Sequence, residues 1–143
     1  MKKYVIIGNS AAAVGAVTSI RETDQEGSIV IISKEPYHTY SRPLISYWLQ
    51  GKVTEEKMLY RDKDFYKANN CTLLPGKEAV SIDQANKIVV LASGENIAYD
   101  KLLVCTGSTP LVPPMEGLEK VGKKFTFLFS DDRCLDIFSI LLV

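Results

Sequence analysis

A short apolar run followed at once by a glycine and a helix-forming segment constrains the fold of this chain more than any other feature. Residues 4–7 (Tyr-Val-Ile-Ile) are rich in β-branched side chains and end at Gly8, which is typical of a parallel strand buried on both faces. Residues 11–23 contain strong helix formers, and Ser10 occupies the position of a helix N-cap. A second apolar run at residues 29–32 completes a strand–helix–strand unit, whose strands we expect to be parallel neighbours.

The turn between this strand and this helix has the form of a dinucleotide-binding fingerprint. It occupies the place of the G-x-G-x-x-G/A pattern, directly after a strand and at the start of a helix. Gly8 permits the tight turn, and Ala13 permits close packing of the helix on the strand. Ser10 replaces the second glycine, so its side chain must point away from the phosphates or donate a hydrogen bond to them. The binding residues predicted here are Gly8, Ser10, Ala11, Ala12 and Ala13, because a helix N-terminus offers free N–H groups to phosphate.

An acidic residue, Glu35, follows the second apolar run. At this position a carboxylate can accept hydrogen bonds from a ribose 2′-hydroxyl, and it would repel a 2′-phosphate. Taken singly, Glu35 reads equally well as a solvated surface acid, and Gly8 as a routine turn at a strand end. Their combination on one βαβ frame favours dinucleotide binding.

The middle of the chain predicts loops and two short helices. Residues 33–51 contain prolines, tyrosines and an arginine, and we expect a site loop there that leads into a short helix at residues 44–49. Asp62 or Asp64 is positioned to cap a second short helix, which ends at residues 69–70, where an asparagine can take the left-handed conformation.

Three further strand regions complete the expected architecture. Residues 71–74 and 102–105 are short apolar runs that we assign to the parallel sheet, whereas residues 77–99 alternate short strands with turn-forming clusters. The sequence therefore predicts an α/β fold with a parallel βαβ core and a small antiparallel β-meander.

Composition narrows the classes of protein. The length of 143 residues suits one domain, and 17 basic against 17 acidic residues give no net charge to attract nucleic acid or an anionic membrane. The cysteines Cys71, Cys105 and Cys134 are odd in number and far apart, which fits neither a disulfide framework nor a zinc site. No run is long enough for a membrane span. We expect a cytoplasmic protein that binds no nucleic acid and no membrane.

Three segments resemble the pyridine nucleotide-disulfide oxidoreductase superfamily of flavoproteins with two dinucleotide-binding domains. They are residues 5–12 (Val-Ile-Ile-Gly-Asn-Ser-Ala-Ala), residues 35–44 with Glu-Pro-Tyr and Tyr-Ser-Arg-Pro-Leu, and residues 99–110 (Tyr-Asp-Lys-Leu-Leu-Val-Cys-Thr-Gly-Ser-Thr-Pro). Within the superfamily, the chain is most similar to rubredoxin or ferredoxin reductases and to the flavin portion of assimilatory nitrite reductases. The resemblance covers residues 3–132.

The resemblance implies a Rossmann-like FAD-binding domain and assigns roles to single residues. FAD would lie on the first fingerprint, with Glu35 on the adenosine ribose and Val80 in contact with the adenine. Arg42 and Pro43 would lie near the pyrophosphate and the flavin. Thr106 and Gly107 match the second FAD motif, a turn at a strand end that passes close to the cofactor.

The chain also departs from the family pattern. Disulfide reductases carry a redox-active C-x-x-x-x-C pair on the helix after the Glu35 loop, whereas residues 44–49 here contain no cysteine. We therefore expect no thiol relay, and we interpret Cys71 and Cys105 as small buried apolar residues. His38, the lone histidine, is interpreted as a loop residue.

The family places an NAD(P)H-binding domain after this region, and the sequence contains no second glycine-rich unit. We expect residues 1–124 to form the N-terminal part of an incomplete FAD-binding domain and residues 125–143 to lead into a missing NAD(P)H-binding domain. The apolar C-terminal residues predict self-association.

The predicted function is the FAD-binding portion of an oxidoreductase that passes electrons from NAD(P)H through FAD to a protein or small-molecule acceptor. The alternatives are a non-catalytic nucleotide-binding module, an inactive truncated remnant, and a domain that binds NAD directly.

Overall fold

The computed structural model describes residues 1–108 and 141–142. The chain divides into two compact units. The fold below is that of the first unit, which contains Met1–Thr106 and Ile140–Val143. With η denoting a 3-10 helix, the elements are β1 Lys3–Ile7, α1 Ala11–Thr23, β2 Ser28–Ser33, η1 Arg42–Leu44, α2 Ile45–Leu49, η2 Glu55–Met58, α3 Phe65–Ala68, β3 Cys71–Pro75, β4 Ala79–Asp83, β5 Ile88–Leu91, β6 Asn96–Ala98, β7 Lys101–Val104 and β8 Leu141–Leu142.

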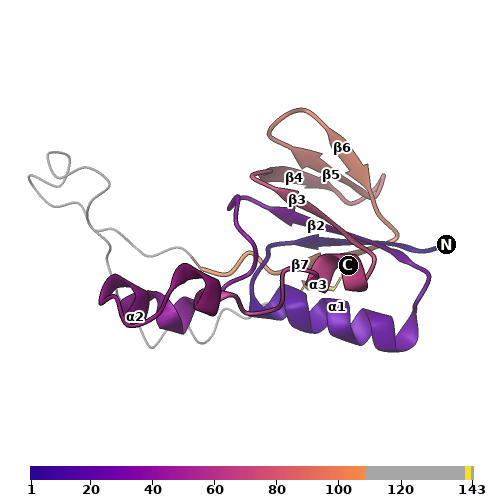
Figure 1. The fold of residues 1–143 in the computed structure, drawn as a ribbon. Coiled ribbons are helices and arrows are strands. Elements are labelled where there is room, and N and C mark those ends of the chain that lie inside the picture. The colour runs from indigo at the N-terminus through magenta and orange to yellow at the C-terminus, as the bar shows by residue number, and fades with distance from the viewer. Residues whose placement is uncertain (109–140, 143) are drawn as a thin grey trace, which may run out of the picture. The chain divides into compact units, whose positions relative to one another are not determined.

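The larger sheet has the strand order β3-β2-β1-β7-β8 (Figure 1). β1 pairs in parallel with β2 and with β7, and β2 pairs in parallel with β3. The predicted parallel βαβ core is therefore confirmed. β8, which the sequence did not predict, adds to the edge strand β7 in the antiparallel sense.

Alternate residues of β1 pack into two separate cores. Val5 and Ile7 lie on the face of the sheet that packs against the meander, in one cluster with the buried residues Val89, Leu91 and Tyr99. Ile6 faces the other way, into a cluster that contains Ala13 and Val17 of α1 and Tyr66 of α3. Because both faces of the sheet are covered at its centre, the central residues of β1 and β2 are apolar, as the sequence indicated.

α1 has the predicted bounds, but one predicted contact is wrong. Ser10 is the N-cap residue by position, with an extended backbone, yet its side chain makes no capping hydrogen bond. The first intrahelical bond runs from the N–H of Val14 to the carbonyl of Ser10, at 3.1 Å. The helix start therefore keeps its own N–H groups free of a side-chain cap.

The second predicted cap is also wrong. Asp64 precedes α3 but makes no side-chain cap, and the N–H of Phe65 donates instead to the backbone carbonyl of Asp62, at 2.9 Å. The expected left-handed asparagine is confirmed, because Asn70 has a φ of 48°.

The smaller sheet is the expected antiparallel meander, with the order β4-β5-β6. The pairing of β4 with β5 shifts between Ala79 and Ser81, which leaves Val80 at a β-bulge. Within residues 1–108 and 141–142, no helix combines the length and the hydropathy that a membrane span requires. The proposed lead-in at residues 125–143, the boundary at residue 124 and Cys134 lie outside the described residues, except for the two residues of β8.

Candidate dinucleotide-binding site

The carboxyl ends of β1, β2 and β7 meet at Gly8. The N–H of Gly8 donates to the carbonyl of Ile32 at 2.8 Å, and the N–H of Cys105 donates to the carbonyl of Ile7 at 2.7 Å. Gly8 has a φ of +111°, and a Cβ built there would stand 2.1 Å from the carbonyl oxygen of Cys105. Only glycine fits this position, because any side chain would collide with the backbone that follows β7.

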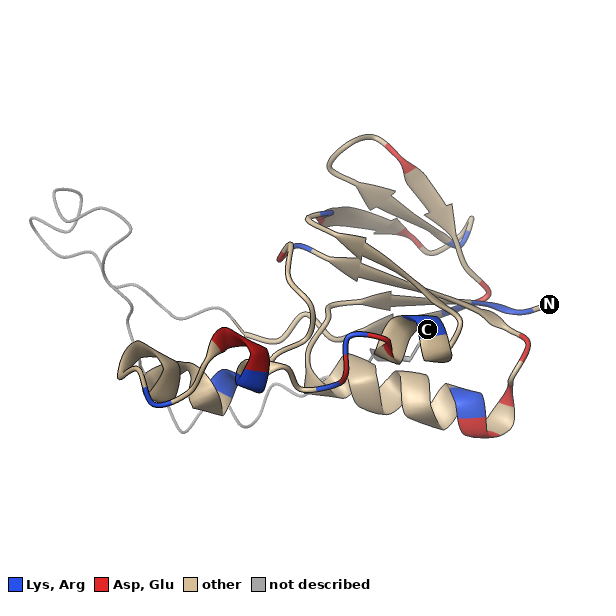
Figure 2. Cartoon of the chain, viewed as in Figure 1, with Lys and Arg blue, Asp and Glu red and all other residues tan. Residues whose placement is uncertain are grey.

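The start of α1 has the properties that favour a negatively charged group. The N–H groups of Ala11, Ala12 and Ala13 precede the first intrahelical bond, and they form no hydrogen bond among the described residues. No acidic residue lies in the first turn of α1, and the charged residues of this helix are at its C-terminal end (Figure 2). The helix dipole and the free N–H groups together favour a phosphate here.

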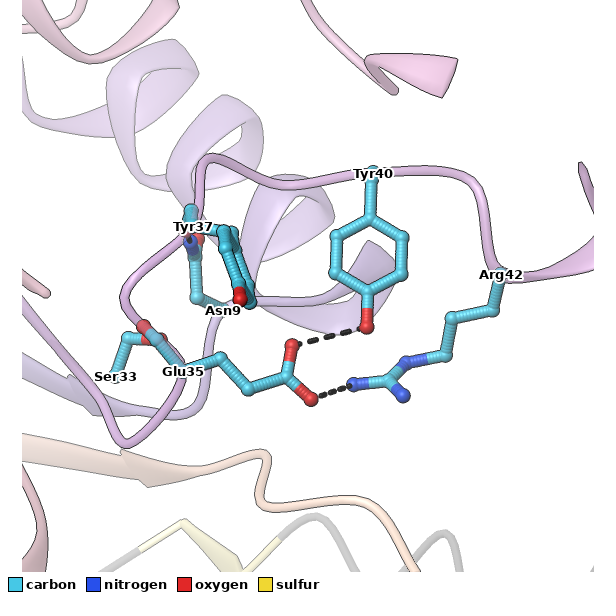
Figure 3. Close-up of polar contacts among 6 residues, drawn as sticks. All are labelled: Asn9, Ser33, Glu35, Tyr37, Tyr40 and Arg42. Atoms are coloured by element: carbon cyan, nitrogen blue, oxygen red, sulfur yellow. Dashed lines mark hydrogen bonds and ion pairs between the residues drawn. The ribbon is translucent and has the colours of Figure 1, made fainter. Parts of the chain in front are cut away.

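Glu35 follows β2 and has both carboxylate oxygens engaged (Figure 3). Oε2 accepts a hydrogen bond from the Tyr40 hydroxyl at 3.0 Å, and Oε1 forms an ion pair with Nη2 of Arg42 at 3.1 Å. The Arg42 guanidinium also lies 5.3 Å from the centre of the Tyr40 ring. Burial raises the pKa of Tyr40, so its phenol stays protonated and can donate to Glu35 at neutral pH.

The Glu35 side chain is nevertheless accessible to a ligand. It is 44% exposed, and an ionised carboxylate offers about four acceptor positions, of which two are used here. A ribose hydroxyl can therefore share the carboxylate with Tyr40 and Arg42. The backbone of Glu35 is fixed independently, since its carbonyl accepts a hydrogen bond from the Ser33 hydroxyl at 2.8 Å.

The start of the meander lies beside the Glu35 loop. The N–H of Gly76 donates to the carbonyl of Glu35 at 3.3 Å, and the N–H of Lys77 donates to the carbonyl of Ser33 at 2.9 Å. Val80 follows three residues later and is 58% exposed. These two backbone hydrogen bonds hold the segment that leads to Val80, the expected adenine contact, beside the loop that carries Glu35, the expected ribose contact.

The other predicted site residues have the following places. Arg42 and Pro43 form the first turn of η1 and are exposed. Thr106 is exposed and comes two residues after β7, next to the Cys105 carbonyl that contacts Gly8. Gly107 has a left-handed φ of +70°.

Sequence reasoning missed two residues at the centre of this region, Asn9 and Tyr66. The Tyr66 hydroxyl donates to Oδ1 of Asn9 at 2.6 Å and accepts the N–H of Thr39 at 3.3 Å. Asn9 belongs to the turn, but Tyr66 comes 57 residues later. No spacing rule connects two such positions, so the pattern carried no signal for this contact.

Two cysteines lie among the described residues. Cys71 and Cys105 are half-buried and pack against the core cluster around Ile6. Burial raises the pKa of both thiols. This agrees with their expected role as small apolar residues, because a reactive cysteine needs a stabilised thiolate.

The residues present fit the diphosphate and ribose of an adenine dinucleotide. The free N–H groups of α1 can hold phosphate oxygens, and Glu35 offers two unused acceptor positions at the end of the neighbouring strand. A parallel βαβ unit with a glycine turn and an acid after its second strand defines a Rossmann-like dinucleotide-binding domain.

Residues 2–136 match the family model described as "Pyridine nucleotide-disulphide oxidoreductase", and the chain belongs to this family. Members of the family are FAD-dependent and use NAD(P)H. The match confirms the resemblance seen in the sequence.

Two curated relatives and one solved structure illustrate the similarity. The NADH-dependent phenylglyoxylate dehydrogenase subunit epsilon of Aromatoleum evansii is 34% identical over 120 residues, which are 84% of this chain and 28% of the relative. The rubredoxin-NAD(+) reductase of Pseudomonas putida is 33% identical over 119 residues, 82% of this chain and 31% of the relative. The structure of NADH:rubredoxin oxidoreductase from Clostridium acetobutylicum has a TM-score of 0.73 at 28% identity and covers 95% of this chain and 34% of its own. The chain thus spans about a third or less of each.

Proposed function

We propose that this chain holds the adenosine diphosphate half of FAD as part of an NAD(P)H-dependent flavoprotein oxidoreductase. The observation that carries the proposal is the packing of Gly8 against the Cys105 carbonyl. This packing brings the backbone after β7 to the start of α1, where free N–H groups can bind an anion.

Each predicted residue has a role in this proposal. The N–H groups of Ala11, Ala12 and Ala13 would bind the phosphates, and Ser10 would border them. Glu35 would bind the adenosine ribose, with Val80 near the adenine. The remaining residues, Arg42, Pro43, Thr106 and Gly107, would lie along the pyrophosphate and the flavin.

FAD bound here would supply the redox chemistry, namely acceptance of a hydride from NAD(P)H and release of electrons to an acceptor. The protein would orient the cofactor, and electrons would not pass through a redox-active cysteine pair. Residues 1–124 would contribute the N-terminal part of the FAD-binding domain, and residues 125–143 would lead into an NAD(P)H-binding domain. We therefore expect little or no reduction of a dye acceptor when the 143-residue chain is mixed with NADH and FAD.

Direct cofactor binding tests the proposal. The chain is purified, denatured, and its released small molecules are identified by mass spectrometry, while FAD, ADP and NAD are titrated into the apoprotein. We expect released FAD, and binding of both FAD and ADP. Binding of NAD in preference to FAD would favour a simple NAD domain, and binding of none of these ligands would favour an inactive remnant.

A matched pair of variants tests the site. Glu35→Gln removes the charge from the proposed ribose acceptor but keeps its shape, and we expect FAD affinity to fall about three- to tenfold, the value of roughly one hydrogen bond. Glu22→Gln makes the same change on an exposed acid at the far end of α1. Equal FAD affinities of the two variants would contradict the role of Glu35.

A further inference from the structure

One side chain connects the two loops that carry the candidate site. The Tyr66 hydroxyl donates to Oδ1 of Asn9 at 2.6 Å and accepts the N–H of Thr39 at 3.3 Å. Asn9 extends this chain of hydrogen bonds, because its Nδ2 donates to the carbonyl of Tyr37 at 3.3 Å. Asn9 lies between Gly8 and Ser10. This series of hydrogen bonds therefore joins the phosphate turn to the loop that begins at Glu35.

Tyr66 is itself firmly held. It is only 8% exposed and belongs to the core cluster beneath β1 and α1. The His38 and Phe65 rings meet it edge-on, at centroid distances of 4.8 and 5.4 Å. Burial raises the pKa of Tyr66, so its hydroxyl remains a donor throughout the neutral range.

The arrangement differs from ordinary core packing in where the hydroxyl points. Apolar contacts alone would hold the ring in the cluster, but the hydroxyl reaches the side chain of Asn9 and the backbone N–H of Thr39, which both lie in segments without regular structure. The N–H of Gly8 holds this turn to β2 through the carbonyl of Ile32, but that bond does not join the turn to the loop that follows β2. The hydrogen bonds of Tyr66 therefore supply an order that local sequence does not.

We propose that Tyr66 is a positioning residue, whose hydroxyl acts through Asn9 and Thr39 to hold the phosphate turn in a fixed relation to the Glu35 loop. The inference rests on the proposed dinucleotide site and extends it. The diphosphate and the ribose of one ligand are joined covalently, so the two loops must keep a set separation if both are to bind at once.

A measurement without ligand tests the connection itself. Amide hydrogen exchange is followed by mass spectrometry in the 143-residue chain and in Tyr66→Phe. We expect exchange about three- to tenfold faster in peptides that cover residues 8–13 and 37–40, since one hydrogen bond no longer holds both segments. Peptides from β5 should be unchanged. Equal exchange of the two loops in both proteins would overturn the inference.

A second tyrosine provides a matched control. The Tyr4 hydroxyl donates to Oδ2 of Asp24 at 2.9 Å, at the opposite end of α1 from the phosphate turn. Tyr4→Phe removes the same atom from a half-buried tyrosine, so we expect it to lower stability without any effect on exchange at residues 8–13. A similar effect of both variants on that turn would mean that general destabilisation, not positioning, is responsible.

Binding of FAD and ADP then tests the consequence for the ligand. We expect Tyr66→Phe to weaken both about three- to tenfold and Tyr4→Phe to leave them unchanged. Asn9→Ala breaks the same contact from the other side, so it gives an independent test even if Tyr66→Phe does not fold. Because Tyr66 acts through Asn9 as well as through Thr39, the double variant should lose less FAD affinity than the sum of the two single losses. Additive losses would overturn the inference.

Hydrogen exchange and ligand binding together distinguish a failure of the proposed function from a failure of the role given to Tyr66. If the unchanged chain binds neither FAD nor ADP while Tyr66→Phe loosens both loops, the proposed function is wrong and the connection is not a device for dinucleotide binding. If the unchanged chain binds FAD and Tyr66→Phe binds it equally well, the proposed function stands and only the role of Tyr66 is wrong.

Discussion

The α-carbon of Gly8 faces the carbonyl of Cys105 so closely that a methyl group there would stand 2.1 Å from the oxygen. We expect Gly8→Ala to lower the free energy of unfolding by about 3 kcal/mol or more, because it adds this clash to a φ of +111°. Urea unfolding followed by circular dichroism measures the change.

Gly15 is the matched control for Gly8. It lies in α1, and no atom beyond the helix's own nearby backbone stands within 4 Å of its Cβ position. Gly15→Ala should raise the free energy of unfolding by about 0.5–1 kcal/mol, since alanine loses less backbone entropy in a helix. Equal effects at the two glycines would show that the turn is not packed as described.

Arg21 ties the end of α1 to the turn before β3. Its guanidinium donates to the carbonyls of Asn69, Asn70 and Asp24, at 2.7, 3.2 and 2.9 Å. We expect Arg21→Ala to cost about 1–3 kcal/mol of unfolding free energy, and Arg21→Lys to recover little of it, because lysine lacks the planar fork. Lys67→Ala, on the exposed face of α3, should change the value by less than about 0.5 kcal/mol.

Acid should weaken the fold through Asp24. The N–H of Gly27 and the Tyr4 hydroxyl donate to its carboxylate and lower its pKa below the ordinary 3.8. A lowered pKa in the folded state means that the stabilisation is present above pH 3.8 and is lost as the pH falls through the folded pKa. Thermal midpoints of the unchanged chain and Asp24→Asn should therefore converge below that pH. A constant difference would contradict this account.

Removal of the Tyr99 hydroxyl should not harm the protein. Tyr99 is 4% exposed, and its hydroxyl has no hydrogen-bond partner among the described residues. Tyr99→Phe removes a buried polar atom and keeps the ring, so we expect the free energy of unfolding to rise by about 1 kcal/mol. A fall in the urea midpoint at constant slope would indicate that the hydroxyl has a partner.

Cys71 and Cys105 should resist alkylation in the folded chain. Burial raises the pKa of both thiols, and only the thiolate reacts with iodoacetamide. The pH of half-maximal labelling should therefore lie above that of the same cysteines in urea, as measured by peptide mass spectrometry. Rapid labelling of either residue at neutral pH would contradict the raised pKa values of these half-buried thiols.

Local sequence rules located the elements well where one segment decides its own structure. The apolar run that contains β1, the helix formers of α1 and the turn clusters of the meander each depend on side chains within a few residues. Glu35 was predicted as a site residue because an acid after the second strand of a βαβ unit has a fixed place in the fold, and its binding role stays a prediction.

The predicted caps by Ser10, Asp62 or Asp64 are wrong because a cap depends on backbone geometry as well as on residue type. Residue type permits such a cap, but the backbone around it decides whether the side chain points at the N–H groups. The preference is local, while the direction of entry into the helix is set by packing elsewhere.

The sequence by itself determined the parallel βαβ core, the glycine turn and the family, since these follow from periodicity and short motifs. Only the tertiary structure decided that Tyr66 reaches Asn9 and that Arg21 reaches Asn69. The physical reason is that a hydrogen bond depends on distance and direction in space. The close packing of distant segments fixes both, and no pattern of neighbouring residues encodes them.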